Sequence, residues 1–242
     1  MNILPTTTAA EVATQAARVA VIPVGSFEQH GSHLPLSTDT IIACAIAEAI
    51  SATYGLFVLP PIPIACSHEH AAWPGTVSIS SATLHRLLND IIDSLRRSGV
   101  HKVVIVNGHG GNYVLANVVQ ELSVDGPDVV LFPGRDDWDK ARDDAGLASS
   151  GHEDMHAGEI ETSVLLHVAP EAVRPNYRQA DSDGTDRRKH LLTLGLQAYT
   201  QSGVVGRPSL ADAGKGKAVL DSLIESFGEY LIVLNQDRHT PR

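Results

Sequence analysis

Residues 19–39 read VAVIPVGSFEQHGSHLPLSTD, an apolar run followed by a turn rich in polar side chains. The run at 19–24 predicts a buried parallel strand, and residues 40–50 predict the helix that follows the turn. Four ionisable side chains lie between them: Glu28, His30, His33 and Asp39. Burying so many ionisable groups is costly, but in open α/β sheets ligands bind beyond the carboxyl ends of the strands. The stretch therefore predicts a functional site at the end of this strand.

The rest of the chain alternates between strand-like and helix-like patterns. Further strands are predicted at residues 56–64, 76–79, 102–106 and 128–132; the first contains three prolines, which favour a sheet edge. Helices are predicted at residues 82–97, from the 107–112 turn to about 122, 156–168, 191–199 and 218–234. Less regular segments are 1–17 (a short helix or arm), 135–154 (a loop with a short helix) and 177–190 (a solvated segment). This alternation predicts an α/β fold in three layers, α/β/α, with a mostly parallel central sheet and a single domain over residues 1–242.

Composition excludes several classes of partner. The 242 residues are 43% apolar and carry a formal net charge of −10, with no basic stripe, which argues against nucleic acid and anionic membranes. The apolar runs are too short to span a bilayer. The two cysteines, Cys44 and Cys66, give no disulfide framework and fit a reducing compartment. We therefore expect a soluble cytoplasmic protein.

Three polar clusters carry the chemistry. They follow predicted strands or open a predicted helix, and consist of Glu28, His30 and Asp39; His109 within NGHGGN (107–112); and His156, Glu159 and Glu161. Together they offer imidazole and carboxylate ligands and no thiolate, a set that suits Zn²⁺, Mn²⁺ or Fe²⁺ better than a structural zinc site. The glycines beside His109 allow a close backbone turn that lets the imidazole project.

The two glutamates of the 156–168 helix differ in position. At 100° per residue Glu161 falls on the apolar face with Ile160 and Val164, whereas Glu159 falls on the other side. A carboxylate on a buried face needs a partner, and a metal ion is a suitable one. Glu159 is instead interpreted as a solvated acid at the helix start or as a group supporting a ligand.

The segments GSFEQHGSHLPLSTD (25–39), NGHGGN (107–112) and HAGEIETS (156–163) together resemble the creatininase (creatinine amidohydrolase) family. The resemblance extends from Val21 to about Pro170 and is weaker around SGVVGRPS (202–209). Members of that family are binuclear-metal hydrolases of cyclic and linear amides on an α/β fold. They include formamide hydrolases and the peptidase that trims the mycofactocin precursor.

Residue by residue, the resemblance implies two divalent cations, zinc first, with manganese or iron as alternatives. Glu28 and His109 would bind one cation and His30 the other, with Asp39 bridging both. Creatininase has a glutamate two positions after the turn histidine, where this chain has Gly111. We expect the missing ligand to be Glu161, with Glu159 as the alternative.

The resemblance also assigns roles around the metals. His156 matches a histidine that assists proton transfer, and Glu159 is a candidate to orient it. Substrate binding is assigned to His70, Trp73, Gly110 and Gly111. Creatininase places tryptophans over its substrate, but His152 and Glu153 stand just upstream of His156 here, which argues against creatinine itself.

These roles predict an amidohydrolase that cleaves the C–N bond of a small cyclic or linear amide with a hydroxide bridging two cations. One alternative is a peptidase that trims a small ribosomal peptide, which a wide, open groove beside the metals would favour. Another is a non-catalytic protein that binds a metal or ligand. The resemblance further suggests a homo-oligomer, with a hexamer as one form.

Overall fold

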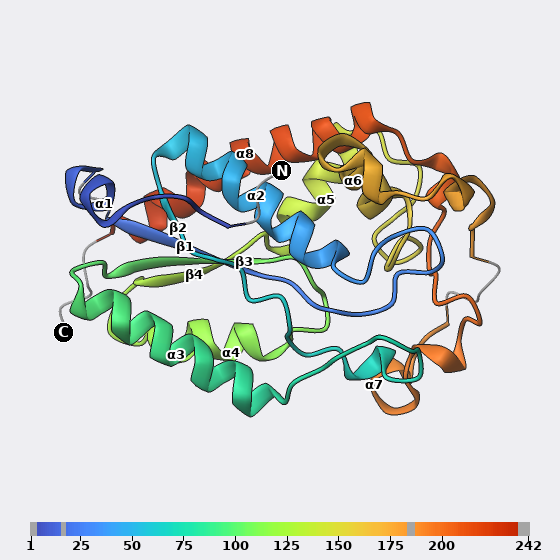
Figure 1. Ribbon diagram of the computed structural model, residues 1–242, viewed down its shortest axis with the longest axis horizontal. Coiled ribbons are helices and arrows are strands. Elements are labelled where there is room, and N and C mark those ends of the chain that lie inside the picture. The colour runs from blue at the N-terminus through green and yellow to red at the C-terminus, as the bar shows by residue number, and fades with distance from the viewer. Residues whose placement is uncertain (1–3, 16–17, 183–186, 237–242) are drawn as a thin grey trace.

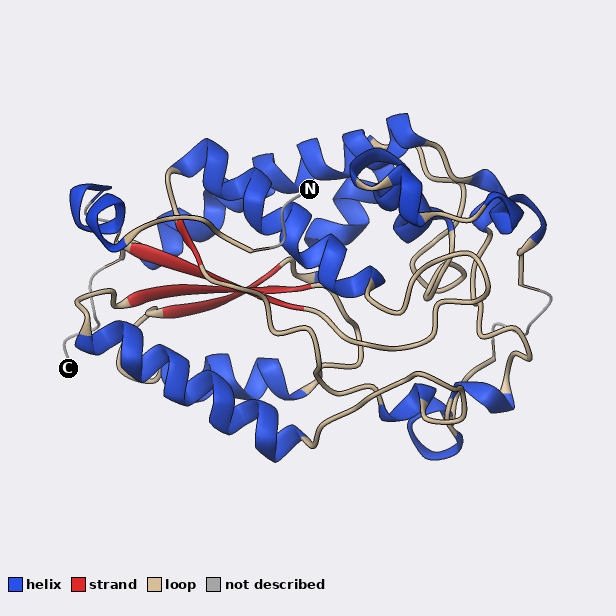
Figure 2. Ribbon diagram, viewed as in Figure 1, coloured by secondary structure: helices blue, strands red, loops and turns tan. Residues whose placement is uncertain are grey.

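The computed structural model describes residues 4–15, 18–182 and 187–236. A four-stranded parallel sheet lies at its centre in the order β2–β1–β3–β4, built from β1 (Val19–Val24), β2 (Phe57–Val58), β3 (Lys102–Asn107) and β4 (Val129–Phe132). Helices cover both faces of this sheet, as Figures 1 and 2 show. The predicted α/β fold in three layers with a parallel sheet is confirmed. No helix within the described ranges is long and apolar enough to cross a membrane.

Two apolar cores lie on the two faces of the sheet, because successive side chains of a strand alternate between faces. On β1, Val19 and Val21 belong to one core, and Ala20, Ile22 and Val24 belong to the other. The central strands are thus buried on both faces, which explains why they read as continuous apolar runs.

The helices divide between the faces. One core packs against α2 (Thr38–Tyr54), α5 (Arg135–Asp144), α6 (Glu159–Val168) and α8 (Ala213–Leu234); the other packs against α3 (Ser81–Arg97) and α4 (Val114–Leu122) (Figure 1). The remaining short helices are α1 (Ala9–Gln15), α7 (Leu191–Leu194), and the 3₁₀ turns η1 (His68–His70), η2 (Pro170–Ala172), η3 (Pro175–Gln179), η4 (Leu196–Ala198) and η5 (Pro208–Leu210).

Several predicted elements are shorter than expected. In the 56–64 run only Phe57 and Val58 pair along β1, with one bridge from Ile62 to Val24, because the three prolines lack the N–H that a ladder requires. Residues 76–79 form no strand, although Val77 N–H donates to Phe27 O at 2.9 Å. The predicted helix at 191–199 divides into α7 and η4 at Gly195, whose φ is 72°.

Other element boundaries also differ from those predicted. The helix expected from residue 156 begins at Glu159, because Ala157 has a φ of 54°, outside the helical range. The short helix expected within 135–154 is α5, and the N-terminal helix or arm corresponds to α1. Residues 183–186 of the segment predicted to be solvated, and residues 1–3 and 16–17 of the predicted arm, lie outside the described residues.

The turns that follow β1 and β3 lie against each other. Gly108 N–H donates to Val24 O at 2.9 Å, and the Asn112 side-chain amide donates to Gly25 O at 3.1 Å. A Cβ on Gly108 would lie 2.3 Å from Asp39 O, so this close approach to the start of α2 requires glycine. The turns therefore bring the polar clusters of both strand ends to one place.

Candidate active site

Glu28, Asp39 and His109 meet beyond the carboxyl ends of β1 and β3. His109 Nδ1 lies 3.0 Å from Asp39 Oδ2, and His109 Nε2 lies 3.1 Å from Glu28 Oε2. The three side chains come from the β1–α2 loop, the first turn of α2 and the β3–α4 turn, and none is more than 6% exposed. Two carboxylates and an imidazole thus lie next to one another in a buried cluster.

A second group adjoins the first through Asp39. His30 Nε2 lies 3.0 Å from Asp39 Oδ1 and 3.9 Å from Glu161 Oε2. Asp39 therefore directs one carboxylate oxygen toward each group, and each group has the composition of a metal site. Of the two glutamates considered from the sequence, the structure brings Glu161 to this position.

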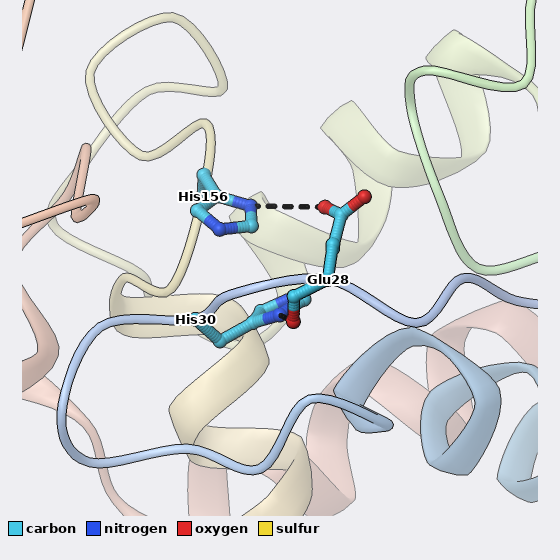
Figure 3. Close-up of side chains that lie close together, drawn as sticks. All are labelled: Glu28, His30 and His156. Carbon is cyan, nitrogen blue, oxygen red and sulfur yellow. Dashed lines mark hydrogen bonds and ion pairs between the residues drawn. The ribbon is translucent and has the colours of Figure 1, made fainter. Parts of the chain in front are cut away.

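His156 and His70 approach the same cluster from the side of Glu28. His156 Nδ1 lies 3.7 Å from Glu28 Oε1, as Figure 3 shows, and the His156 ring centroid is 4.2 Å from that of His30. His70 Nε2 lies 3.2 Å from Glu28 Oε1. His156 thus joins Glu28 and His30 in a third set of candidate ligands.

Burial and neighbouring charges shift the pKa values of several side chains in the cluster. Burial raises the pKa of Glu28 and of Glu161 to about 7. Burial works against charging His30 and His109, yet the surrounding carboxylates raise their pKa values to about 9 and about 10. Burial and the neighbouring His109 lower the pKa of His70 to about 3. A site with this many coupled charges is typical of metal and catalytic centres.

The cluster fits divalent cations. Both carboxylate oxygens of Glu28 and the Nε2 atom of His109 are buried without a hydrogen-bond partner. Ligands about 2.1 Å from a tetrahedral zinc ion lie roughly 3.4 Å from each other. The separations from His30 Nε2 to Asp39 Oδ1 (3.0 Å) and Glu161 Oε2 (3.9 Å), and from His109 Nε2 to Glu28 Oε2 (3.1 Å), are close to that spacing. A cation beside Glu28 and His109 would give these atoms the partner that they lack.

Neighbouring groups hold these side chains in place. Ser26 Oγ donates to Asp39 Oδ2 at 2.6 Å, and His30 Nδ1 lies 3.1 Å from Glu28 O. Buried His33 does not enter the cluster: its Nε2 lies 3.0 Å from Ala157 O, and Ala157 N–H donates to Glu161 Oε2 at 2.5 Å. Contacts of this kind fix the orientation of metal ligands.

Glu159 lies elsewhere. Its side chain is fully buried, and its carboxylate pairs with Lys215 Nζ at 2.6 Å and accepts from the backbone N–H groups of Ala148 and Ser149. The interpretation as a solvated acid is therefore wrong, because α8 packs against this side of α6 and supplies the lysine. None of its contacts among the described residues is to His156, so its contacts give no support to the role of orienting that histidine.

A cavity of about 760 Å³ opens beside the cluster. The residues that line it include His109, Gly110 and Glu161 of the site region and the large side chains of Trp138 and Met155. Two of the other residues predicted to bind substrate, Trp73 and Gly111, are not in the lining of this cavity. Trp73 has its ring centroid 6.3 Å from that of His70, and Gly111 lines a second cavity of about 450 Å³.

Sequence reasoning missed two residues of the site. Glu69 Oε1 lies 3.6 Å from His109 Nε2, in space that a Cβ at Gly111 would fill, since the two would be 2.0 Å apart. Gln29 contacts both His70 and His156 through its side-chain amide. The available signals were the position of Gln29 between two predicted ligands and the glycine at 111 that leaves room for another side chain.

Comparisons with known proteins match this chain to one family of proteins. The sequence profile of the Creatininase family, described as creatinine amidohydrolase, matches residues 5–231. A mycofactocin precursor peptide peptidase of Mycolicibacterium smegmatis is 33% identical over 230 residues, covering 91% of this chain and 87% of that protein. A creatinine amidohydrolase of Pseudomonas putida is 29% identical over 234 residues, covering 87% of each.

The fold is also that of solved creatininases. A mutant creatininase described as of the Zn-Zn type matches with a TM-score of 0.79 at 21% identity, covering 96% of this chain and 97% of that one. The family profile spans nearly the whole chain, and the relatives it matches are hydrolases by name. The chain belongs to the creatininase family and is a metal-dependent amidohydrolase.

Proposed function

We propose that this chain hydrolyses an amide bond of a peptide at a centre of two divalent cations. The observation that carries the proposal is the position of Asp39, whose two carboxylate oxygens each lie 3.0 Å from a different histidine, His30 and His109. Glu28 completes the group around His109, and Glu161 completes the group around His30. Zinc is the expected metal, since it accepts mixed imidazole and carboxylate ligands and a relative of the same fold is of the Zn-Zn type.

The residues have distinct roles in this reaction. Bound divalent cations supply an acidified water and polarise the carbonyl oxygen of the amide. His156 presents Nδ1 toward Glu28 Oε1, 3.7 Å away, where it can accept a proton from the attacking water and then pass it to the leaving nitrogen. Trp138 and Met155 supply apolar walls that hold the substrate beside the cluster. His109, which lines the cavity, is only 6% exposed, and this burial limits the access of bulk water to its side chain.

The size of the cavity favours a peptide over a small cyclic amide. Its volume of about 760 Å³ lies in the upper part of the range of roughly 300–1,000 Å³ typical of drug-sized ligands. Charged and polar side chains, Arg135, Asp139 and His152, also line it and can contact a substrate with polar groups. The peptidase relative supports the same choice, since it covers 91% of this chain. Small cyclic and linear amides remain the second candidate.

Metal analysis of matched variants tests the two-cation centre. We expect two zinc ions per chain in the unaltered protein, about one in His109→Ala and almost none in Asp39→Ala, because only Asp39 belongs to both groups. His85→Ala is the control, since His85 pairs with Glu121 on α4, away from the cluster. Retention of one tightly bound ion in Asp39→Ala would contradict a shared carboxylate.

A substrate panel tests the reaction. The zinc-loaded protein is incubated with short peptides, N-formyl amines and creatinine, and products are followed by mass spectrometry. The proposal expects peptide cleavage that Asp39→Ala abolishes and His85→Ala keeps. Turnover of creatinine or of formyl amines without peptide cleavage would move the substrate class to small amides, and no turnover of any amide would favour a binding protein.

A further inference from the structure

The side chain of Gln29 lies between two histidines of the site and contacts the backbone on both sides. It is 5% exposed, and it comes from the loop after β1, between Glu28 and His30. Its Oε1 accepts from Gly31 N–H at 2.9 Å, and its Nε2 donates to Gly203 O at 3.0 Å. Exchanging the oxygen and nitrogen would set two donors against each other and two acceptors against each other, so these contacts fix the orientation of the amide.

The proton position on His156 follows from its backbone contact. His156 Nε2 lies 2.7 Å from Gln29 O, a carbonyl oxygen that can only accept. Nε2 therefore carries the hydrogen and donates, and Nδ1 of the neutral ring keeps its lone pair. That lone pair is on the side of Glu28, with Nδ1 3.7 Å from Oε1 (Figure 3).

The proton position on His70 then follows by elimination. The Gln29 amide has two hydrogens on Nε2, and one is used by Gly203 O. The second has two nitrogen atoms within reach, His156 Nε2 at 3.1 Å and His70 Nδ1 at 2.9 Å. His156 Nε2 already carries a hydrogen and cannot accept, so His70 Nδ1 is the acceptor. The neutral His70 ring thus carries its hydrogen on Nε2, which lies 3.2 Å from Glu28 Oε1.

We propose that Gln29 is a positioning residue that makes His70 a hydrogen-bond donor and keeps His156 an acceptor at the same face of the site. The two rings lie 4.3 Å apart at their centroids, and both approach the same carboxylate oxygen of Glu28. Amide hydrolysis needs both a hydrogen-bond donor and a proton acceptor. The carbonyl oxygen of the amide gains negative charge, and a proton moves to the leaving nitrogen. His70 Nε2–H would donate to the carbonyl oxygen of the substrate. His156 Nδ1 would take a proton from the attacking water and give it to the leaving nitrogen. This reading of the roles depends on the proposed amide hydrolysis, whereas the proton positions do not.

The loop around Gly203 packs closely against the side-chain amide of Gln29. A Cβ at Gly203 would lie 1.9 Å from Gln29 Oε1, and Gly203 has a φ of +82°. Both observations require glycine at position 203, within the SGVVGRPS segment (202–209). The Gln29 backbone N–H donates separately to Thr76 Oγ1 at 3.1 Å, so the position of the loop and the amide contacts can be altered independently.

Nitrogen-15 NMR of histidine-labelled, zinc-loaded protein tests the assignment directly. The zinc form is diamagnetic, and the spectra of His70→Gln and His156→Gln identify the two rings. We expect one-bond N–H coupling at Nε2 of both rings in the unaltered protein. In Gln29→Met, His70 should lose that single form and His156 should keep it, because only His156 retains its backbone acceptor. Thr76→Val is the matched control and should leave both rings unchanged.

Hydrolysis rates give a second measurement. Mutating a residue that hydrogen-bonds to a ligand of a metal site typically lowers metal affinity or activity roughly 10–100-fold, and we take the same range for the residue that orients His70. We expect this loss in kcat for Gln29→Met, with the zinc content unchanged, and less than about a threefold change for Thr76→Val. Nδ1–H on His70 in the unaltered protein, or an unchanged His70 form in Gln29→Met, would overturn the assignment even if Gln29→Met were unstable. If the NMR spectra show the expected forms but no hydrolysis is detected, the proposed function is contradicted and the assignment of the proton positions is kept.

Discussion

Glu159 and Glu161 are two residues apart on α6 and have opposite surroundings. Glu161 Oε2 lies 3.9 Å from His30 Nε2 within a candidate metal group, whereas Glu159 pairs with Lys215 behind the helix. At the residue scale, an identical side chain is a ligand candidate in one position and a structural ion pair in the other. The pair therefore offers a matched comparison of function and stability.

The same substitution at these two positions should separate activity from stability. Glu161→Gln should lower the hydrolysis rate by at least about 100-fold, since even supporting residues of metal ligands contribute roughly 10–100-fold. Glu159→Gln should keep more of the activity but lower the free energy of unfolding by about 1–3 kcal/mol, since it leaves Lys215 and two N–H groups poorly paired. Urea unfolding and initial rates measure both. Loss of zinc in Glu159→Gln but not in Glu161→Gln would reverse the assignment.

The start of helix α6 is held by side chains that lie outside the helix. The N-cap position of α6 is Gly158, which offers no side-chain acceptor. Asp154 accepts instead from the N–H groups of Glu159 and Ile160, and Arg142 of α5 donates to the same carboxylate at 2.9 Å. At the scale of elements, the start of the helix that carries Glu161 is therefore fixed by a side chain outside that helix.

The close crossing of α6 and α8 predicts a large effect at one glycine. A Cβ at Gly216 would lie 2.0 Å from Ser163 O on α6, so Gly216→Ala should push the helices apart and cost about 1–3 kcal/mol of unfolding free energy. Gly228 on the same helix is the control, because its Cβ would meet only Tyr54 Oη at 3.4 Å. Gly228→Ala should be neutral or stabilise by up to about 1 kcal/mol. Equal effects in urea unfolding would show that the crossing is looser than described.

At the scale of the whole molecule, the site joins segments that are far apart in the chain. Its side chains come from the β1–α2 loop, α2, the β3–α4 turn and the start of α6, so bound cations would cross-link both strand ends to the outer helices. Ligands that bind only the folded state stabilise it, by about 2.7 kcal/mol when present at 100 times Kd. Metal removal should thus affect the entire fold as well as the reaction.

The pKa shifts give this effect a pH dependence. The pKa values of Glu28 and Glu161 are raised to about 7 and those of His30 and His109 to about 9 and about 10, so the metal-free folded state holds protons that the unfolded chain releases. The stability that these four groups contribute is therefore present at low pH and is lost as pH rises through these values. His70, with a pKa lowered to about 3, has the opposite sign but acts only below its ordinary value of 6.5.

Thermal unfolding in chelator and in zinc measures this prediction. Between about pH 7 and pH 8.5 the Tm of the metal-free protein should fall, and the rise in Tm caused by zinc should grow, because cations replace the protons that are lost. The Asp39→Ala variant should show a much smaller zinc increment at every pH. A zinc increment that shrinks as pH rises would contradict the proposed ligands.

The strands and ligand types were predictable from the sequence because they depend on short-range patterns. Buried parallel strands are continuous apolar runs, so β1, β3 and β4 were found nearly to the residue. The polar turns at their ends contain Glu28, His30 and His109, and parallel strands end at one edge of the sheet, so their convergence was expected as well. Prolines and a glycine shortened β2 and divided the 191–199 helix, which local patterns predicted less well.

The tertiary structure alone decided which polar side chains face one another. Glu159 was placed by Lys215 of α8, and Gln29 by His70, His156 and Gly203, all distant in the chain. Periodicity gives the face of a helix or strand on which a residue lies but not what packs against that face. The sequence by itself thus determined the strands β1, β3 and β4 and the kinds of candidate metal ligand. The packing of loops and helices around the strand ends determined which side chains face one another, because such contacts depend on distances of a few ångströms between segments that only the folded chain brings together.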